Sequence, residues 1–173
     1  HNNVKALYYD ADKEIIWIGT HLGGLNRLDI RSGHFTHYRM EDNNRQTLPS
    51  DIVRDIIPYK DLLIVATQNG VCLFDPDSGK CRQLFKDSKE GKSIKMVADI
   101  LLDSEGTLWI AATGEGVFSY RFDTRKLTNY RHDSANPNSL SNNNVNNIMQ
   151  DSQGHLWFST SGSGLDLYHP ANN

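Results

Sequence analysis

The chain consists of short apolar stretches that alternate with polar turns rich in Gly, Asp, Ser and Asn. One group of such stretches runs over Val97–Asp103, Thr107–Thr113, Val117–Phe122 and Lys126–Arg131. No stretch with the period of a helix competes with this pattern. Strands of this length joined by such turns predict an up-and-down antiparallel meander.

The same group recurs along the whole chain. Four related segments cover Ile16–Leu25, Leu62–Val71, Leu108–Val117 and Leu156–Leu165. Their closing glycines recur at intervals of 46, 46 and 48 residues, at Gly24, Gly70, Gly116 and Gly164. Repeats of about 40 to 50 residues built from short strands are typical of β-propeller blades. We therefore predict an all-β fold of about four four-stranded antiparallel meanders, the last of which lacks its outer strand.

The predicted blades are residues 1–51, 52–96, 97–144 and 145–173. A single four-stranded sheet cannot bury both faces, whereas sheets stacked around an axis can. We therefore interpret residues 1–173 as a partial β-propeller, an arc of a larger ring. Uncovered apolar blade faces predict self-association, by default as a homodimer. A closed four-bladed monomer is the alternative.

Positions that are the same in every repeat and positions that vary between repeats indicate different roles. A large apolar residue that recurs in every copy indicates packing between blades, and these positions are Trp17, Leu63, Trp109 and Trp157. Polar residues vary in the turns that follow, and loops on a rigid scaffold often carry function. The candidate ligand-binding residues are His21, Gln68, Asn69, Glu115, Ser161 and Ser163.

Composition narrows the choice of function. The 173 residues carry a formal net charge of −3, which argues against binding to nucleic acid or to an anionic membrane. The sequence has no apolar run of about 18 residues and no signal peptide. It also begins without a methionine, so we expect a piece of a larger protein.

The only two cysteines flank a turn. Cys72 and Cys81 lie on either side of Asp75–Gly79, where facing strands of a hairpin can bring them together. A disulfide bond needs Cβ atoms about 3.8 Å apart, and the strand register is not fixed by the sequence. Two free, partly buried thiols are the favoured expectation, with the bond as the alternative.

No catalytic constellation is present in the sequence. It contains no Gly-x-Ser-x-Gly elbow, no His-Glu-x-x-His motif and no phosphate-binding loop. The turns Asp103–Gly106 and Asp151–Gly154 are too short for an EF-hand loop and lack its distal Glu. His34 and His37 are close in sequence, but on a strand they face opposite ways. We predict no catalytic residue, no metal and no cofactor.

The repeats resemble the two-component regulator propeller repeat. That repeat has an Asp-x-x-Gly turn, a Leu-Trp-Ile-Gly-Thr strand and a Gly-Leu strand that ends near Asp. Leu156-Trp157 after Asp151–Gly154 matches it, as does Trp17–Thr20 followed by Gly23–Asp29. The resemblance covers nearly the whole chain, although the second copy lacks both the Trp and the Asp-x-x-Gly turn.

The resemblance implies a function that the residues alone do not. Such repeats form propellers in the extracytoplasmic sensor region of hybrid histidine kinases of Bacteroides-type bacteria, which commonly sense oligosaccharides for polysaccharide utilisation. The chain looks like about half of one such propeller, periplasmic and non-catalytic, with an oligosaccharide as the ligand of the intact sensor. The alternatives are a fragment of a propeller-type polysaccharide lyase or glycan-processing enzyme, and a protein–protein interaction scaffold.

Overall fold

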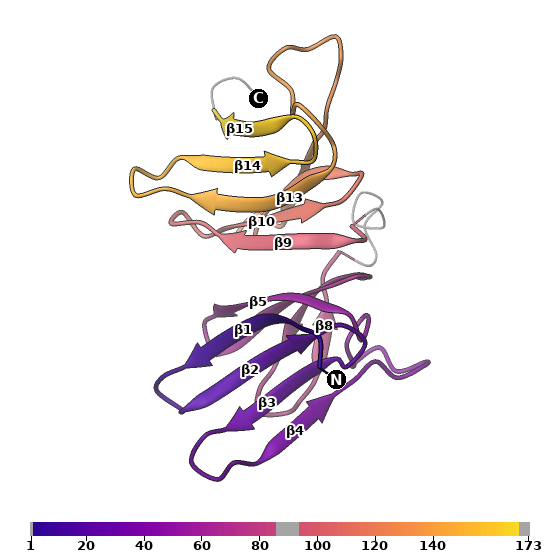
Figure 1. Ribbon diagram of the computed structural model, residues 1–173, viewed down its shortest axis with the longest axis vertical. Helices are drawn as coiled ribbons and strands as arrows, with labels where there is room; N and C mark the ends of the chain where they lie inside the picture. The colour runs from indigo at the N-terminus through magenta and orange to yellow at the C-terminus, as the bar shows by residue number, and fades with distance from the viewer. Residues whose placement is uncertain (1, 86–93, 170–173) are drawn as a thin grey trace. The chain divides into compact units, whose positions relative to one another are not determined.

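The computed structural model describes residues 2–85 and 94–169. All regular structure in these ranges is β-strand, in four antiparallel sheets. The chain divides into two compact units, residues 1–87 and residues 88–173, and each unit holds two sheets (Figure 1). No helix in the described part of the chain is long and apolar enough to cross a membrane.

The first unit contains two four-stranded meanders. One sheet has the order β1 (Val4–Asp10), β2 (Ile15–Thr20), β3 (Leu25–Asp29) and β4 (Phe35–Tyr38). The other has the order β5 (Val53–Tyr59), β6 (Leu62–Thr67), β7 (Gly70–Phe74) and β8 (Cys81–Gln83). The sheets stack with β5 against β1 and β2.

The second unit repeats the arrangement with one strand fewer. One sheet has the order β9 (Val97–Leu102), β10 (Thr107–Ala112), β11 (Gly116–Arg121) and β12 (Lys126–Tyr130). The other has β13 (Val145–Gln150), β14 (Leu156–Thr160) and β15 (Gly164–Tyr168). β13 lies against β9 and β10, as Figure 1 shows. The predicted all-β fold of blade-like meanders is confirmed. Each sheet lies within one predicted blade, while the blade boundaries themselves stay predictions.

Two of the closing glycines, Gly24 and Gly116, occupy positions that a side chain could not share. Gly24 and Gly116 have φ of +68° and +83°. A Cβ atom on Gly24 would lie 2.2 Å from the carbonyl oxygen of Tyr38, and one on Gly116 would lie 2.2 Å from that of Tyr130. The turn after the second strand therefore presses against the end of the outer strand, which only glycine permits.

Trp17 and Trp109 fill the space between the two sheets of their units. Trp17 is 1% exposed and meets the Phe74 ring edge-on, with ring centroids 5.4 Å apart. Trp109 is 4% exposed and meets the Tyr168 ring edge-on at 4.9 Å. Trp157, on β14, is only half-buried. Aromatic contacts of this geometry add to the burial of apolar area in holding stacked sheets together.

In the second repeat, the strand register places Ile64 at the Trp position, not Leu63. Thr20 and Thr67 pair with the first residues of β1 and β5, and Trp17 and Ile64 each lie three residues before them. Sequence alignment on the closing glycine fails here because the turn from Thr67 to Gly70 is one residue shorter than its counterpart. Leu63 lies on the other face of β6, in the same buried cluster as Trp17.

The linkers that follow β4 and β12 fold alike. The main-chain N–H of Glu41 donates to Thr47 Oγ1 at 3.0 Å, and that of Asp133 donates to Ser139 Oγ at 2.9 Å. In both loops an Asn side chain accepts from the N–H two residues later. Each loop ends on a buried leucine, Leu48 or Leu140, which belongs to the core of its unit. These side-chain bonds fold two polar linkers into defined shapes.

The expectation of free thiols is wrong. Cys72 and Cys81 form a disulfide bond, with Cα atoms 5.9 Å apart. β7 and β8 pair so that Cys81 lies opposite Phe74, which makes Cys72 its diagonal neighbour on the same face. This register brings both sulfur atoms into the core between the sheets of the first unit.

We expect loss of this disulfide to lower the free energy of unfolding of the first unit by about 2–3 kcal/mol, because the bond closes a short loop in the unfolded chain. Urea denaturation of the oxidised chain and of the Cys72→Ser, Cys81→Ser double variant measures the difference. As the control, the same urea denaturation is monitored by hydrogen exchange of amides in β9–β15, which reports on the second unit. An equal loss in the second unit would contradict a local effect.

Candidate functional site

The turns and linkers that carry the candidate binding residues lie at one end of each sheet. The N–H of Gly24 donates to the carbonyl of Asp51 at 2.9 Å, so the β2–β3 turn contacts the linker that enters the next sheet. The N–H of Gly116 donates to the carbonyl of Asn143 at 3.0 Å in the same way. We call this end of each unit, with its β2–β3-type turns and its linker, the rim.

In the first unit the rim brings together His21, Gln68 and Asn69. The N–H of Gln68 donates to Ile52 O at 2.9 Å. Ile52 directly follows Asp51, the linker residue that contacts the β2–β3 turn. Asn69 Nδ2 donates to Pro49 O at 3.4 Å. His21 and Gln68 are half-buried, whereas Asn69 is exposed. Turns that are far apart in sequence thus form one polar surface.

In the second unit the rim holds Glu115, Ser161 and Ser163. The N–H of Ser161 donates to Asn144 O at 2.8 Å. Asn144 directly follows Asn143, the linker residue that the β10–β11 turn contacts. Both serines are exposed. Glu115 forms an ion pair with Arg131, so its carboxylate already has a cationic partner.

Two arginines belong to the rim and were missed by the sequence reasoning. Arg39 Nη1 donates to Leu22 O at 3.2 Å and lies 3.5 Å from Asp51 Oδ2. Arg131 Nη2 donates to Gly114 O at 3.4 Å. Both come directly after β4 or β12, and the repeated pairs Tyr38-Arg39 and Tyr130-Arg131 are the signal in the sequence that could have found them.

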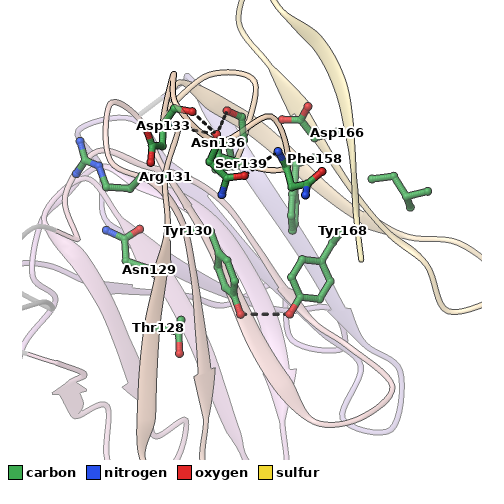
Figure 2. A pocket seen from close by; sticks show the side chains of 13 residues that line it. Thr128, Asn129, Tyr130, Arg131, Asp133, Asn136, Ser139, Phe158, Asp166 and Tyr168 are labelled. Atoms are coloured by element: carbon green, nitrogen blue, oxygen red, sulfur yellow. Dashed lines mark hydrogen bonds between the residues drawn. The ribbon is translucent and has the colours of Figure 1, made fainter. Parts of the chain in front are cut away.

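A cavity of about 380 Å³ lies in the second unit between β12, the following linker and β15 (Figure 2). Its apolar side includes Phe158, Tyr130 and Tyr168, and the two tyrosine hydroxyls lie 3.2 Å apart. Its polar side is the linker, with Asp133 and Asn136. The other lining residues are Thr128, Asn129, Arg131, Asn138, Ser139, Leu140, Asp166 and Leu167. The sequence analysis did not predict this cavity.

Asp166 is held at the edge of this cavity by the linker. Its Oδ2 accepts from the N–H of Ser141 at 2.9 Å and from Ser141 Oγ at 3.0 Å. Ser141 Oγ also lies 3.2 Å from Thr160 Oγ1. The carboxylate therefore ties β15 to the linker that runs past its outer side.

The two Asp-led turns hold tryptophans at the other end of the sheets. Trp157 Nε1 donates to Asp151 Oδ2 at 3.0 Å, and Trp109 Nε1 donates to Asp103 Oδ2 at 2.7 Å. The indole donor, with help from the N–H and the ring of His155, lowers the pKa of Asp151 to about 2. In the described ranges no group of three His, Cys, Asp or Glu side chains is close enough to hold a metal ion. Asp103 and Asp151 thus each hold the tryptophan of the strand that follows their turn.

We expect the contribution of Asp151 to stability to be lost as the pH falls from about 4 to about 2. Its pKa is lowered on folding from 3.8 to about 2, so the native state favours the ionised form and the contribution is complete above pH 4. NMR titration of the carboxyl group measures the midpoint. Trp157→Phe removes the main donor and moves the midpoint up, and His155→Ala moves it less. An unchanged midpoint in Trp157→Phe would contradict this account.

Two family models match the chain. The SMP-30/gluconolactonase/LRE-like region matches residues 6–117, and the two component regulator propeller matches residues 139–162. The chain belongs to the SMP-30/gluconolactonase/LRE-like family and carries the two component regulator propeller repeat. The first match covers most of the chain, whereas the second covers one repeat. A comparison with curated proteins finds no match.

Solved structures with this fold include extracellular domains of two component systems. The extracellular domain of a putative hybrid two component system from B. thetaiotaomicron superimposes with a TM-score of 0.84 and 22% identity, over 99% of this chain and 23% of that one. A second such domain from the same organism gives a TM-score of 0.53 and 25% identity, over 95% and 27%. The WD40 β-propeller domain of Doa1 gives 0.68 and 12%, over 98% and 52%.

These similarities confirm the β-propeller fold that the repeats predict. The chain spans about a quarter of the length of the two extracellular domains it matches. Both of those domains are extracellular, in agreement with the extracytoplasmic location that the resemblance implies. The candidate ligand-binding residues on the rim stay a prediction.

Proposed function

We propose that the chain is part of a ligand-sensing propeller in the extracytoplasmic region of a hybrid two-component sensor kinase. The observation that carries this proposal is the two component regulator propeller repeat, on a fold shared with extracellular domains of such systems. In this role the propeller catalyses nothing. A ligand that binds one conformation of the sensor better than another shifts their populations, and the shift reaches the kinase.

The proposed ligand is an oligosaccharide bound at the rim. Sugar hydroxyls both donate and accept hydrogen bonds. The rim of the first unit offers amides at Gln68 and Asn69, and the rim of the second unit, taken by itself, offers hydroxyls at Ser161 and Ser163. These groups stand on turns whose backbone is tied to the linkers by hydrogen bonds. A fixed backbone reduces the entropy that must be lost when such side chains bind a ligand.

Calorimetric titration with a panel of oligosaccharides tests this proposal. We expect one class to release heat, and Gln68→Ala to weaken its binding about tenfold or more, since a polar partner is left without its hydrogen bond. Gln153→Ala removes the same side chain from the opposite end of a sheet and leaves binding unchanged. Absence of heat from every oligosaccharide, with the intact sensor region as well as with this chain, would overturn the sugar proposal.

An enzyme is the second candidate, because the SMP-30/gluconolactonase/LRE-like model covers residues 6–117. Release of product from a polysaccharide or hydrolysis of a sugar lactone by this chain would favour it. A protein scaffold, the third alternative, would instead capture a stable protein partner and no small ligand.

We also propose that the chain self-associates, by default as a homodimer. The support is that large apolar side chains on β1 and β13 are exposed, among them Leu7, Tyr9 and Met149, and apolar patches in water favour association. Multi-angle light scattering between about 1 and 100 µM measures the mass, and we expect it to rise with concentration. A constant monomer mass over this range would rule the proposal out.

A further inference from the structure

The tryptophan of the first repeat lacks the hydrogen-bond partner that the other two tryptophans have. Trp109 Nε1 and Trp157 Nε1 each donate to the Asp that opens the preceding turn. Trp17 is 1% exposed, yet within residues 2–85 and 94–169 its Nε1 has no acceptor. The atom is not fully enclosed by protein either, so the small exposure of the ring includes its donor. Because a buried indole N–H normally has a partner, this donor indicates a place for an acceptor.

One extra residue in the β1–β2 turn explains the difference. Asp10 and Asp103 are counterparts, because each lies two residues beyond the strand residue that pairs with the tryptophan. The tryptophans of the second unit follow their Asp by six residues, whereas Trp17 follows Asp10 by seven. In the longer turn the carboxylate of Asp10 accepts from the N–H of Lys13 at 3.2 Å. The turn thus leaves the indole of Trp17 without the acceptor that the repeat usually supplies.

Two cavities lie at this end of the first unit, and Trp17 lines both of them. Their volumes are about 210 Å³ and about 230 Å³, well above the roughly 30 Å³ that one water molecule occupies in the liquid. They share Asp10, Lys13, Trp17 and Pro76, and we call them together the Trp17 cavity. All residues that line it belong to the first unit.

The walls of the Trp17 cavity carry charges of both signs. The cations are Lys13, Arg27 and Lys60, and the carboxylates are Asp10, Asp12, Asp61 and Asp77. A charged ligand of either sign would therefore lie close to a like charge, which costs free energy. A neutral ligand avoids this cost and can still bond to both kinds of group.

Two tyrosine hydroxyls add neutral groups to these walls. Tyr8 lines one of the two cavities and Tyr38 lines the other. Burial, helped by the carboxylates of Asp10 and Asp12, raises the pKa of Tyr8, and burial raises the pKa of Tyr38. Both hydroxyls therefore stay protonated at neutral pH and can donate as well as accept. A ligand that fits these walls must itself both accept and donate, as a hydroxyl group does.

We propose that the Trp17 cavity binds a neutral small molecule with several hydroxyl groups, such as a polyol or a single sugar ring. One ligand hydroxyl accepts from Trp17 Nε1, in the place that the Oδ2 of Asp103 takes in the second unit. Its other hydroxyls donate to the carboxylates and accept from Lys13. The site lies at the end of the sheets opposite the rim, and it does not depend on the ligand proposed for the rim.

Nitrogen-15 NMR of the three indole N–H groups tests the site on the full chain. In the free chain we expect the indole N–H of Trp17 to exchange with water about tenfold faster than the other two, which are hydrogen-bonded. Glucose or myo-inositol is expected to shift the Trp17 signal with half-saturation at about 1–10 mM, a weak affinity that suits a ligand of few atoms. No shift with either probe up to about 100 mM would overturn the proposal.

A variant with a shorter turn removes the site and keeps Trp17. Deletion of Ala11 together with Glu14→Gly gives an Asp-x-x-Gly turn, and Glu14 already has a positive φ of 53°, as Gly106 has in such a turn. We expect Asp10 to accept from the indole in this variant and the probes to bind at least about tenfold more weakly. Unchanged affinity together with a protected indole N–H would contradict the proposal.

Trp17→Phe provides a second test that leaves the turn as it is. It keeps an aromatic ring but removes the donor, and we expect the affinity for the probes to fall about tenfold. The backbone amide signals of Lys13 and Asp77 measure this affinity. Trp157→Phe removes an indole donor at the same end of a sheet in the second unit and is expected to leave binding unchanged. Equal affinity in the two variants would overturn the role of Trp17.

Charged probes and a rim variant test the ligand class and the location. Glucosamine carries an ammonium group and glucuronate a carboxylate on the same ring, and both are expected to bind about threefold or more weakly than glucose. Tighter binding of either one would overturn the neutral ligand. Gln68→Ala is expected to leave the binding of glucose unchanged, so this site and the rim can fail independently. A loss of binding in Gln68→Ala would assign the probe to the rim and overturn the proposal.

Discussion

Trp109→Ala is expected to lower the free energy of unfolding of the second unit by about 3–5 kcal/mol, the range for a large aromatic residue removed from a core. The ring is 4% exposed and contacts aromatic rings of both sheets, Tyr130 at 5.7 Å and Phe158 at 5.7 Å between centroids. Its removal leaves a cavity where the sheets meet. It also leaves Asp103 Oδ2 without the indole donor.

Native-state hydrogen exchange of amides in β10 and β14 measures this effect, because it reports on the second unit without relying on tryptophan fluorescence. Trp157→Ala is the matched control: the same side chain is lost with the same kind of Nε1–Asp bond, but the ring is only half-buried. We expect it to cost about half as much. Equal losses would mean that the hydrogen bond to Asp, and not the packing between sheets, dominates.

The sequence was sufficient for the fold because the determinants of a blade are local. Short strands and turn glycines recur in every copy at intervals of 46 to 48 residues, although the second copy lacks the Trp and the Asp-x-x-Gly turn. The positive φ of Gly24 and Gly116 follows from the turn they close. The strands of the last repeat, up to Tyr168, also follow from the pattern alone.

The features that the sequence missed depend on register between strands. The shorter turn before Gly70 moves Ile64 into the Trp position, which alignment on glycine cannot show. The disulfide depends on Cys72 and Cys81 being diagonal neighbours, which follows from the pairing of β7 with β8. The cavity beside β15 is a product of the folded linker and the strand edge together. None of these has a marker at a single position.

Gly116→Ala is expected to cost at least about 3 kcal/mol, well above the cost of positive φ alone. For a residue with a Cβ atom, the left-handed conformation at +83° costs roughly 1–2 kcal/mol. In addition, that Cβ atom would lie 2.2 Å from the carbonyl oxygen of Tyr130, a backbone atom that cannot move without opening the pairing of β11 with β12. The clash adds the cost of a broken strand end to the cost of the dihedral angle.

Gly106→Ala separates the two contributions. Gly106 has φ of +78°, nearly the same as Gly116 and in the same sheet, but a Cβ atom there would have no atom within 4 Å. Urea denaturation of the two variants is therefore expected to show a loss of about 1 kcal/mol for Gly106→Ala and the larger loss for Gly116→Ala. If both variants lose the same free energy of unfolding, the closing glycine is needed only for the turn. If Gly116→Ala loses more, the glycine is also needed for the contact between the turn and the outer strand, which explains why the repeat keeps the spacing between the glycine and that strand.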